Sequence, residues 1–359
     1  MFSPELYQLL ATVITDVTIY FVLYFIASIS LNVQYGYGGI PNFGLVLSVA
    51  GGAYVTGALL GRIAGLYYGV GLDMDFMLQN SEITTMINQR LASDPLGGTM
   101  LFLLIVAISF LVCAGLGFVA SYPANRLGAT YLMMALIAMA EAIRIVGENY
   151  YPLVGGTFWV HVPNVFAWMG SLQWIGVPLV FVCIAVLVFL VVELMMSSPF
   201  GRLIRAVREN ETIVECLGKG IVKIKTTVVV LGSVIASLSG ILYAFYCQAV
   251  MATAFQRTDW TFYPWLMIML GGRGNNMGTL AGVVIFVLVR RSIVIFKHDI
   301  QAYVPIETIW LEMLMMSAFL ILVMIYRPQG LVPEKPTRIR GISCEDFAKQ
   351  KRRGRDNAR

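Results

Sequence analysis

Long apolar runs alternate with shorter polar segments along most of the chain. Several runs of about 20 residues contain almost no charge, which is the length a helix needs to cross about 30 Å of hydrocarbon. They predict membrane segments at residues 9–31, 43–61, 99–120, 129–147, 172–194, 226–248, 260–270, 278–296 and 307–326. The seventh is too short to cross as a straight helix, so it is expected to be re-entrant or tilted. The pattern predicts an all-α, polytopic transmembrane bundle of eight or nine segments, because a membrane β-barrel would show short segments that alternate with period two.

One polar, charge-rich segment, Ser197 to Thr227, interrupts the apolar pattern in mid-sequence. Its apolar residues recur with helical spacing and form one stripe, made of Leu203, Val207, Val214 and Leu217. We predict one helix, or two short helices bent near Asn210. Salt bridges are expected along the exposed face, in the pairs Arg205–Glu209 and Arg208–Glu211. Gly218 and Gly220 are expected to end the helix, since glycine readily takes the left-handed conformation found at helix C-termini.

Composition and charge place these segments relative to the membrane. Hydrophobic residues make up 58% of the chain and charged residues 13%, whereas soluble domains carry about 25% charged residues. Residues 197–227 hold six Lys and Arg, and residues 327–359 hold ten against four acidic residues. Because basic loops stay in the cytoplasm, both are predicted to be cytoplasmic. The N-terminus and residues 62–98 and 148–171 are then outside.

The basic tail bears on the domain organisation. We expect one transmembrane domain at residues 1–330, in the inner or plasma membrane, and a disordered cytoplasmic tail at 331–359 near anionic membrane lipid. Nucleic-acid binding is not expected, because no folded basic domain accompanies the tail. Between the polar segment and the tail the chain must cross an even number of times, as four spans or as two spans and a re-entrant hairpin. The cluster Arg290, Arg291 and Lys297 argues against four spans, since it would then lie outside.

Residues that could carry covalent or metal chemistry are sparse. The five cysteines are scattered without a CxxC pair, and His161 and His298 lie far apart. We see no Ser/His or Cys/His arrangement and no paired acidic motif. The sequence therefore predicts no metal site, no cofactor on this chain and no catalytic residue, which disfavours an intramembrane enzyme. Asp16 and Glu193 lie near span ends and are expected at the membrane interface.

The polar segment is similar to a known pattern. Residues 201–226 read GRLIRAVRENETIVECLGKGIVKIKT, which resembles the cytoplasmic loop of ABC importer permeases of the branched-chain (hydrophobic) amino acid type. Four more segments resemble motifs of that family in the same order: LNVQYGYGGIPNFG at 31–44, EAIRIV at 141–146, LGGRGNNMGTLAG at 270–282 and IYRPQGLVP at 325–333. One departure is Leu45, where many members carry histidine, so the first motif does not identify the solute.

The resemblance implies a permease subunit that moves branched-chain or other hydrophobic amino acids inward and catalyses no reaction. Its implied partners are a second, similar permease, two cytoplasmic ATPase subunits and an extracytoplasmic solute-binding protein. The ATPase-coupling residues carried over from the motif are Gly201, Arg205, Arg208, Glu209, Asn210, Glu211, Val214, Leu217 and Gly218. Two other functions stay open, namely the same architecture for urea, short amides or another small organic solute, and an ion-driven secondary transporter. For residues 197–227 the alternative to coupling is an amphipathic helix that rests on lipid headgroups.

Polar residues within or between the apolar runs are candidates for the substrate pathway. They are Asn32, Gln34, Tyr37, Asn42, Glu141 and Arg144. Glu141 and Arg144 lie three residues apart in one span and can pair, either as a structural ion pair or beside a zwitterionic substrate. The segment 31–44 is either an ordinary cytoplasmic turn or an unwound piece that reaches into the bundle.

The glycine-rich segment 270–282 is not a phosphate-binding loop, because it has no lysine in the Walker position. We expect a tight turn whose small residues allow close helix packing, in preference to a direct substrate contact. The glycines assigned to this structural turn are Gly271, Gly272, Gly274, Gly278 and Gly282.

Overall fold

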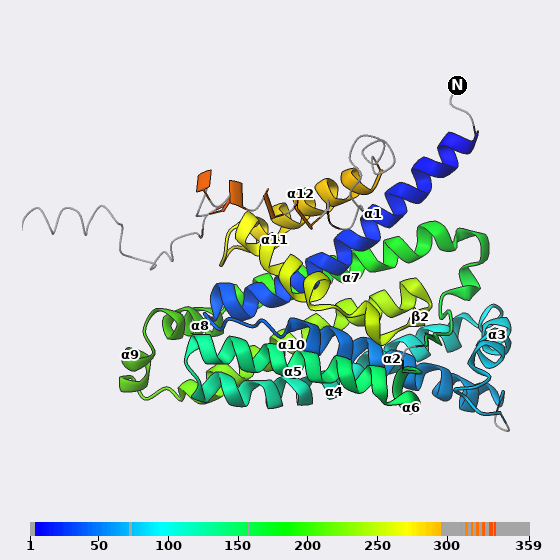
Figure 1. The fold of residues 1–359 in the computed structure, drawn as a ribbon, viewed down its shortest axis with the longest axis horizontal. Coiled ribbons are helices and arrows are strands. Elements are labelled where there is room, and N and C mark those ends of the chain that lie inside the picture. Colours follow the sequence, from blue (N-terminus) through cyan, green and yellow to red (C-terminus); the bar gives the residue numbers. More distant parts are fainter. Residues whose placement is uncertain are drawn as a thin grey trace, which may run out of the picture.

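The computed structural model is a helical bundle built on six long apolar helices (Figure 1). It describes residues 4–71, 74–156 and 158–295 together with residues 310, 313–314, 317–318, 321–322, 325–326, 330–332 and 334, with side chains from residue 13 to 292 and at those later positions. Within this part of the chain, the helices long and apolar enough to cross a membrane are Val13–Tyr37, Leu45–Tyr68, Pro95–Arg126, Ala129–Asn149, Ala167–Ser197 and Ile221–Cys247. They confirm the first six predicted segments. The ninth, 307–326, lies largely outside the described residues.

The elements follow one another along the chain as follows. They are α1 (Pro4–Leu31), η1 (Asn32–Tyr37), α2 (Leu45–Tyr68), α3 (Asn80–Leu91), α4 (Pro95–Arg126), α5 (Ala129–Asn149), α6 (Tyr151–Val154), β1 (Val160–His161), η2 (Ala167–Leu172), α7 (Gln173–Ser197), α8 (Pro199–Glu209), α9 (Glu211–Cys216), α10 (Ile221–Cys247), β2 (Ala249–Val250), η3 (Ala252–Ala254), η4 (Thr258–Phe262), α11 (Tyr263–Gly271) and α12 (Asn276–Ile295).

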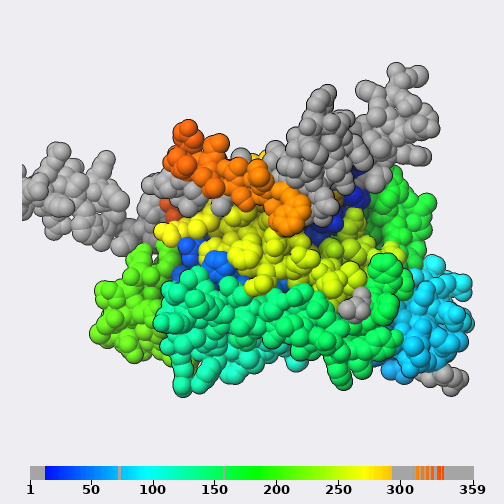
Figure 2. Space-filling model, viewed as in Figure 1, coloured from blue at the N-terminus to red at the C-terminus, as the bar shows by residue number. Residues whose placement is uncertain are grey.

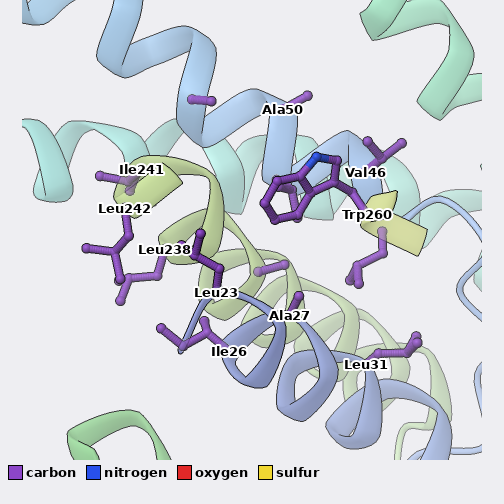
Figure 3. Close-up of a cluster of buried hydrophobic side chains, with 14 of the residues drawn as sticks. Leu23, Ile26, Ala27, Leu31, Val46, Ala50, Leu238, Ile241, Leu242 and Trp260 are labelled. Atoms are coloured by element: carbon purple, nitrogen blue, oxygen red, sulfur yellow. The ribbon is translucent and has the colours of Figure 1, made fainter. Parts of the chain in front are cut away.

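The core lies between α2 and α10, which are the most buried spans. In the most apolar stretch of each span, 83% of the α2 residues and 72% of the α10 residues are buried, against 22% in α4 and 17% in α5. Leu, Ile, Val and Ala side chains from α1, α2 and α10 fill the core, together with Trp260 of η4 (Figure 3). Gly52 of α2 faces Ser237 of α10, and Gly240 of α10 faces Ala53. Such small residues allow the close helix approach that holds membrane bundles together.

The seventh and eighth predicted segments form one sharply bent pair. Residues 258–271 and 276–292 meet at a bend of 117°, so α12 turns back alongside α11. Arg290 pairs with Asp259, with an Nη2–Oδ1 distance of 3.6 Å, and Arg291 pairs with Asp16, with an Nη2–Oδ2 distance of 3.7 Å. Asp16 also accepts a hydrogen bond from the Tyr246 hydroxyl at 2.6 Å.

Short connections close the end of the bundle opposite α8 and α9 (Figure 1). The antiparallel ribbon of β1 and β2, two residues on each strand, is the one departure from an all-α fold in the described residues. The ribbon is tied to α3, since the Asn80 side-chain oxygen accepts the His161 backbone N–H at 2.6 Å. A second bond joins the Asn88 side-chain oxygen to the Asn164 N–H at 2.8 Å. These contacts fix the loops at this end relative to the spans.

Candidate functional site

The polar segment folds into two short helices, α8 and α9, at one end of the bundle (Figure 1). They are separated by Asn210, whose backbone is extended at φ −158° and ψ 107°. The Asn210 side chain accepts the Ile213 N–H at 3.1 Å and caps α9, as asparagine commonly does at a helix N-terminus. Gly218 takes the left-handed conformation, φ +74°, after the end of α9. The predicted bend near Asn210 and the predicted stop at Gly218 are confirmed.

The apolar side of this segment is divided between the bundle and the solvent. Gly201, Val207 and Val214 are buried, but Leu217 is 72% exposed and Ile213 is 59% exposed. The prediction that Leu217 shares one stripe with the others was therefore wrong. Val214 of α9 stays on the buried side, but α9 ends at Cys216 and Leu217 is its C-cap residue, so the helical spacing does not extend to Leu217. Ile213 and Leu217, one turn apart, leave an apolar pair uncovered.

The charged residues of α8 and α9 pair differently from the prediction. Arg208 donates to both carboxylate oxygens of Glu334, at 3.0 and 2.9 Å, and to the Gly36 carbonyl. Lys225 pairs with Glu211 at 2.8 Å. The guanidinium of Arg205 lies 5.0 Å from the centre of the Tyr37 ring, so both predicted pairs were wrong. Pairs within one helix are worth only about 0.2–0.5 kcal/mol, and here the arginines face η1 while Glu209 faces the solvent.

Behind α8, the π-helical segment η1 holds a fully buried polar cluster. Asn32 donates to the Asn276 side-chain oxygen at 3.0 Å and accepts the Gly274 N–H at 2.9 Å. Asn42 donates to the Gln34 side-chain oxygen at 2.8 Å. These amides and Tyr37 are at most 4% exposed. Residues 31–44 thus form an irregular piece that reaches into the bundle, the second of the two predicted alternatives, and protein groups satisfy its side chains.

The glycine-rich turn connects α11 and α12 beside η1. Gly272 at φ +114° and Gly274 at φ +74° reverse the chain direction, in conformations that other residues rarely adopt. A Cβ at Gly278 would lie 2.7 Å from the Gly271 carbonyl oxygen, and one at Gly282 would overlap the Met267 carbonyl. The glycines therefore let the backbones of the two helices touch. The N–H of Gly274 would be only 2.7 Å from a Cβ at Gly36, so the turn packs directly on η1.

A second charged cluster lies on α5. Arg144 donates to Glu141, with an Nε–Oε1 distance of 2.8 Å, and to Glu148 at 2.6 Å. Arg257, which precedes η4, pairs with the other Glu141 oxygen at 3.1 Å. These side chains are between 21% and 43% exposed. In Figure 2, α5 lies along the lower front of the molecule, and no other element covers it there. No hydrogen bond or ion pair links this cluster to the η1 cluster among the described residues.

The chain matches a known family over most of its length. Residues 13–324 match the family described as branched-chain amino acid transport system, permease component. The chain belongs to this family. The permease is 36% identical over 326 residues to the probable branched-chain amino acid transport permease protein LivM of Methanocaldococcus jannaschii, covering 90% of this chain and 94% of that protein. It is a transport subunit and not an enzyme.

Two bacterial proteins are more distant relatives of the permease. These are the high-affinity branched-chain amino acid transport system permease proteins LivM of Salmonella typhimurium and Escherichia coli. Each is 25% identical over 343 residues, covering 89% of this chain and 69% of the relative. No solved structure gives a significant match to the permease.

Several partners of the polar residues of the permease could not be predicted from the sequence. The sequence did not indicate that the exposed Glu193 carboxylate accepts a hydrogen bond from Asn276 at 2.7 Å. Glu148 stands four residues after Arg144, a spacing that could have identified it as a second partner. Arg257 and Glu334 carry no such local signal. In the described part of the permease, no three His, Cys, Asp or Glu side chains gather to hold a metal ion.

Proposed function

We propose that the permease carries branched-chain or other hydrophobic amino acids inward, driven by two separate ATPase subunits that bind α8 and α9. The observation that carries this proposal is that α9, a short helix at the end of the bundle, leaves Ile213 and its C-cap residue Leu217 exposed. Short amphipathic helices with apolar anchors are typical ligands for a groove on a partner. The lipid-surface alternative is disfavoured for α9, because its charged residues are the exposed acids Glu211 and Glu215, which an anionic leaflet repels.

The same proposal gives the permease an orientation and two further partners. The end that carries α8 and α9 is cytoplasmic, in agreement with the six Lys and Arg of residues 197–227. The opposite end, with α3 and the β1–β2 ribbon, is extracytoplasmic and receives a solute-binding protein. A second, similar permease packs against this one and completes the pathway between them.

The charged cluster on α5 supports a pathway that runs along this helix. Charged groups in a span cost several kcal/mol unless protein or water surrounds them, and Glu141, Arg144 and Glu148 are incompletely covered by their own chain. This flank of α5 therefore faces the second permease and the pathway, where Arg144 can meet a carboxylate and Glu141 an ammonium group. Asn32, Gln34, Tyr37 and Asn42 form the inner part of the pathway in a closed state, because they are buried.

Substitution of the exposed apolar pair tests the ATPase contact. Leu217→Asp and Ile213→Asp should each lower the amount of ATPase that co-purifies with the permease pair by about tenfold or more, as for anchors at an interface centre. Leu78→Asp, at the opposite end and 77% exposed, is the matched control and should retain the ATPase. Full ATPase recovery with Leu217→Asp would show that α9 is not the contact.

A further inference from the structure

Arg208 of α8 points into the bundle, away from the exposed side of the coupling helices. Its guanidinium donates to the backbone carbonyl of Gly36 in η1 and to the carboxylate of Glu334. Its side chain also covers Gly39, where a Cβ would lie 2.7 Å from the Arg208 Cγ. Arg208 thus contacts η1 at Gly36 and the residue Gly39 that follows it, whereas its neighbour Glu209 faces the solvent.

Glu334 lies in a C-terminal segment that is fixed to the end of α11. The backbone N–H groups of residues 331–332 donate to the carbonyls of residues 270–271, at 3.0 and 2.9 Å. The Glu334 carboxylate lies against Gly274, where a Cβ would meet its carboxylate carbon at 2.9 Å. The contact of Arg208 with Glu334 therefore joins α8 to the turn between α11 and α12.

The polar contacts continue from this turn into the spans. Gly274 donates to Asn32, Asn32 donates to Asn276, and Asn276 donates to Glu193 of α7. One chain of polar contacts thus runs from α8 through Glu334 and η1 to α12 and α7. It passes through η1, the π-helical segment between α1 and α2. Single π-helical turns are frequent at functional sites.

We propose that Arg208 and Glu334 form a polar latch that fixes η1 to the coupling helices, so that a displacement of α8 moves η1. This inference rests on the proposed function, because the ATPase supplies the displacement. Arg208 is then a positioning residue of the transport cycle and not an ATPase contact, and the segment around Glu334 belongs to the coupling machinery. The latch joins the cytoplasmic helices to the amide cluster of Asn32 and Gln34.

The burial of the pair suits a latch that opens and closes. The side chains of Arg208 and Glu334 are 22% and 31% exposed. Charge-assisted hydrogen bonds of this kind are stronger than neutral ones, so the pair can transmit a displacement. Because water reaches both groups, the pair can also separate without leaving a fully buried, uncompensated charge, which is the large cost of breaking a buried salt bridge.

Swapping the charges of Arg208 and Glu334 in the assembled complex tests the latch. The variants are Arg208→Glu, Glu334→Arg and the double exchange, reconstituted with the second permease, the ATPases and the binding protein. The measured quantity is solute transported per ATP hydrolysed. Each single variant should lower this ratio by about tenfold, within the range of coupling between contacting charges. The double exchange should recover part of the loss, because it restores the ion pair but not the hydrogen bond to the Gly36 carbonyl. Lys223→Glu, an exposed charge on α10, is the control and should keep the ratio.

A second measurement keeps the test independent of transport. Amide hydrogen exchange at residues 32–40 should become faster in Arg208→Glu and return part of the way to the wild-type rate in the double exchange, while α2 stays protected. An unchanged transport ratio in both single variants, or a double exchange no better than either, would overturn the latch. If Leu217→Asp releases the ATPase in the same preparations, the proposed function still stands. If Leu217→Asp retains the ATPase, the proposed function fails, and the exchange rates alone decide whether Arg208 holds η1.

Discussion

Gly240 is a position where α10 touches the backbone of α2. In Gly240→Ala the new methyl group would overlap the carbonyl oxygen of Val49 and lie 2.8 Å from its carbonyl carbon and 3.2 Å from the Ala53 nitrogen. These neighbours are helix backbone atoms, which cannot rotate away as a flexible side chain can. The methyl group is therefore accommodated only if α10 moves away from α2 along their shared face.

The size of the effect follows from two opposing terms. Forcing an extra methyl group into a packed core costs about 1–3 kcal/mol. Replacing glycine by alanine within a helix returns up to about 1 kcal/mol. Because the obstructing atoms of Val49 are backbone, the cost lies at the upper end, and we expect a net loss of about 2 kcal/mol. Gly115→Ala in α4 is the control, because no heavy atom lies within 4 Å of its new methyl group.

The assay is the equilibrium unfolding of the purified permease in mixed detergent micelles, with increasing SDS and tryptophan fluorescence as the signal. Gly240→Ala should unfold at a lower SDS fraction than the wild type, and Gly115→Ala at the same or a higher fraction. A Gly240→Ala protein as stable as the Gly115→Ala control would refute the close α2–α10 contact and the packing derived from it.

Two further predictions concern the pathway and the coupling helices. Arg144→Gln should lower solute uptake by about tenfold or more while the complex still assembles, because glutamine cannot offer the substrate carboxylate a charge-assisted hydrogen bond, worth about 1.5–3 kcal/mol. Normal uptake in proteoliposomes would remove Arg144 from the pathway. Asn210→Ala should destabilise α9 by about 1 kcal/mol through loss of its N-cap and speed amide exchange at Ile213, and Asn210→Ser should not. Equal exchange in the two variants would show that the cap is not what holds α9.

The spans and the polar segment were predictable because their signal is local. A run of apolar residues long enough to cross a bilayer has few other folds available, and six of the predicted segments are confirmed. The break between α8 and α9 was also predictable, since Asn210 disfavours a helix interior and Gly218 favours a helix end. These features depend on residues within one or two turns of each other.

The partners of the charged residues could not be predicted from their spacing in the sequence. Arg208 stands three residues from Glu211, yet it pairs with Glu334, 126 residues away in sequence. A surface ion pair within one helix contributes little stability, so the arginine pairs instead with a half-buried carboxylate on another element, where the charge-assisted hydrogen bonds are stronger. The partner of Glu193 was not predictable for the same reason, because only the fold brings Asn276 of the bent α11–α12 pair beside it.

ATP-dependent uptake by the reconstituted complex tests the central claim most directly, which is that the permease is driven through α8 and α9. Proteoliposomes would hold the permease, a second permease and the ATPases, with the binding protein and a labelled branched-chain amino acid on the opposite side. We predict accumulation that requires ATP on the side of α8 and α9 and is abolished by Leu217→Asp. Uptake by the two permeases alone, driven by an ion gradient and unaffected by Leu217→Asp, would contradict it.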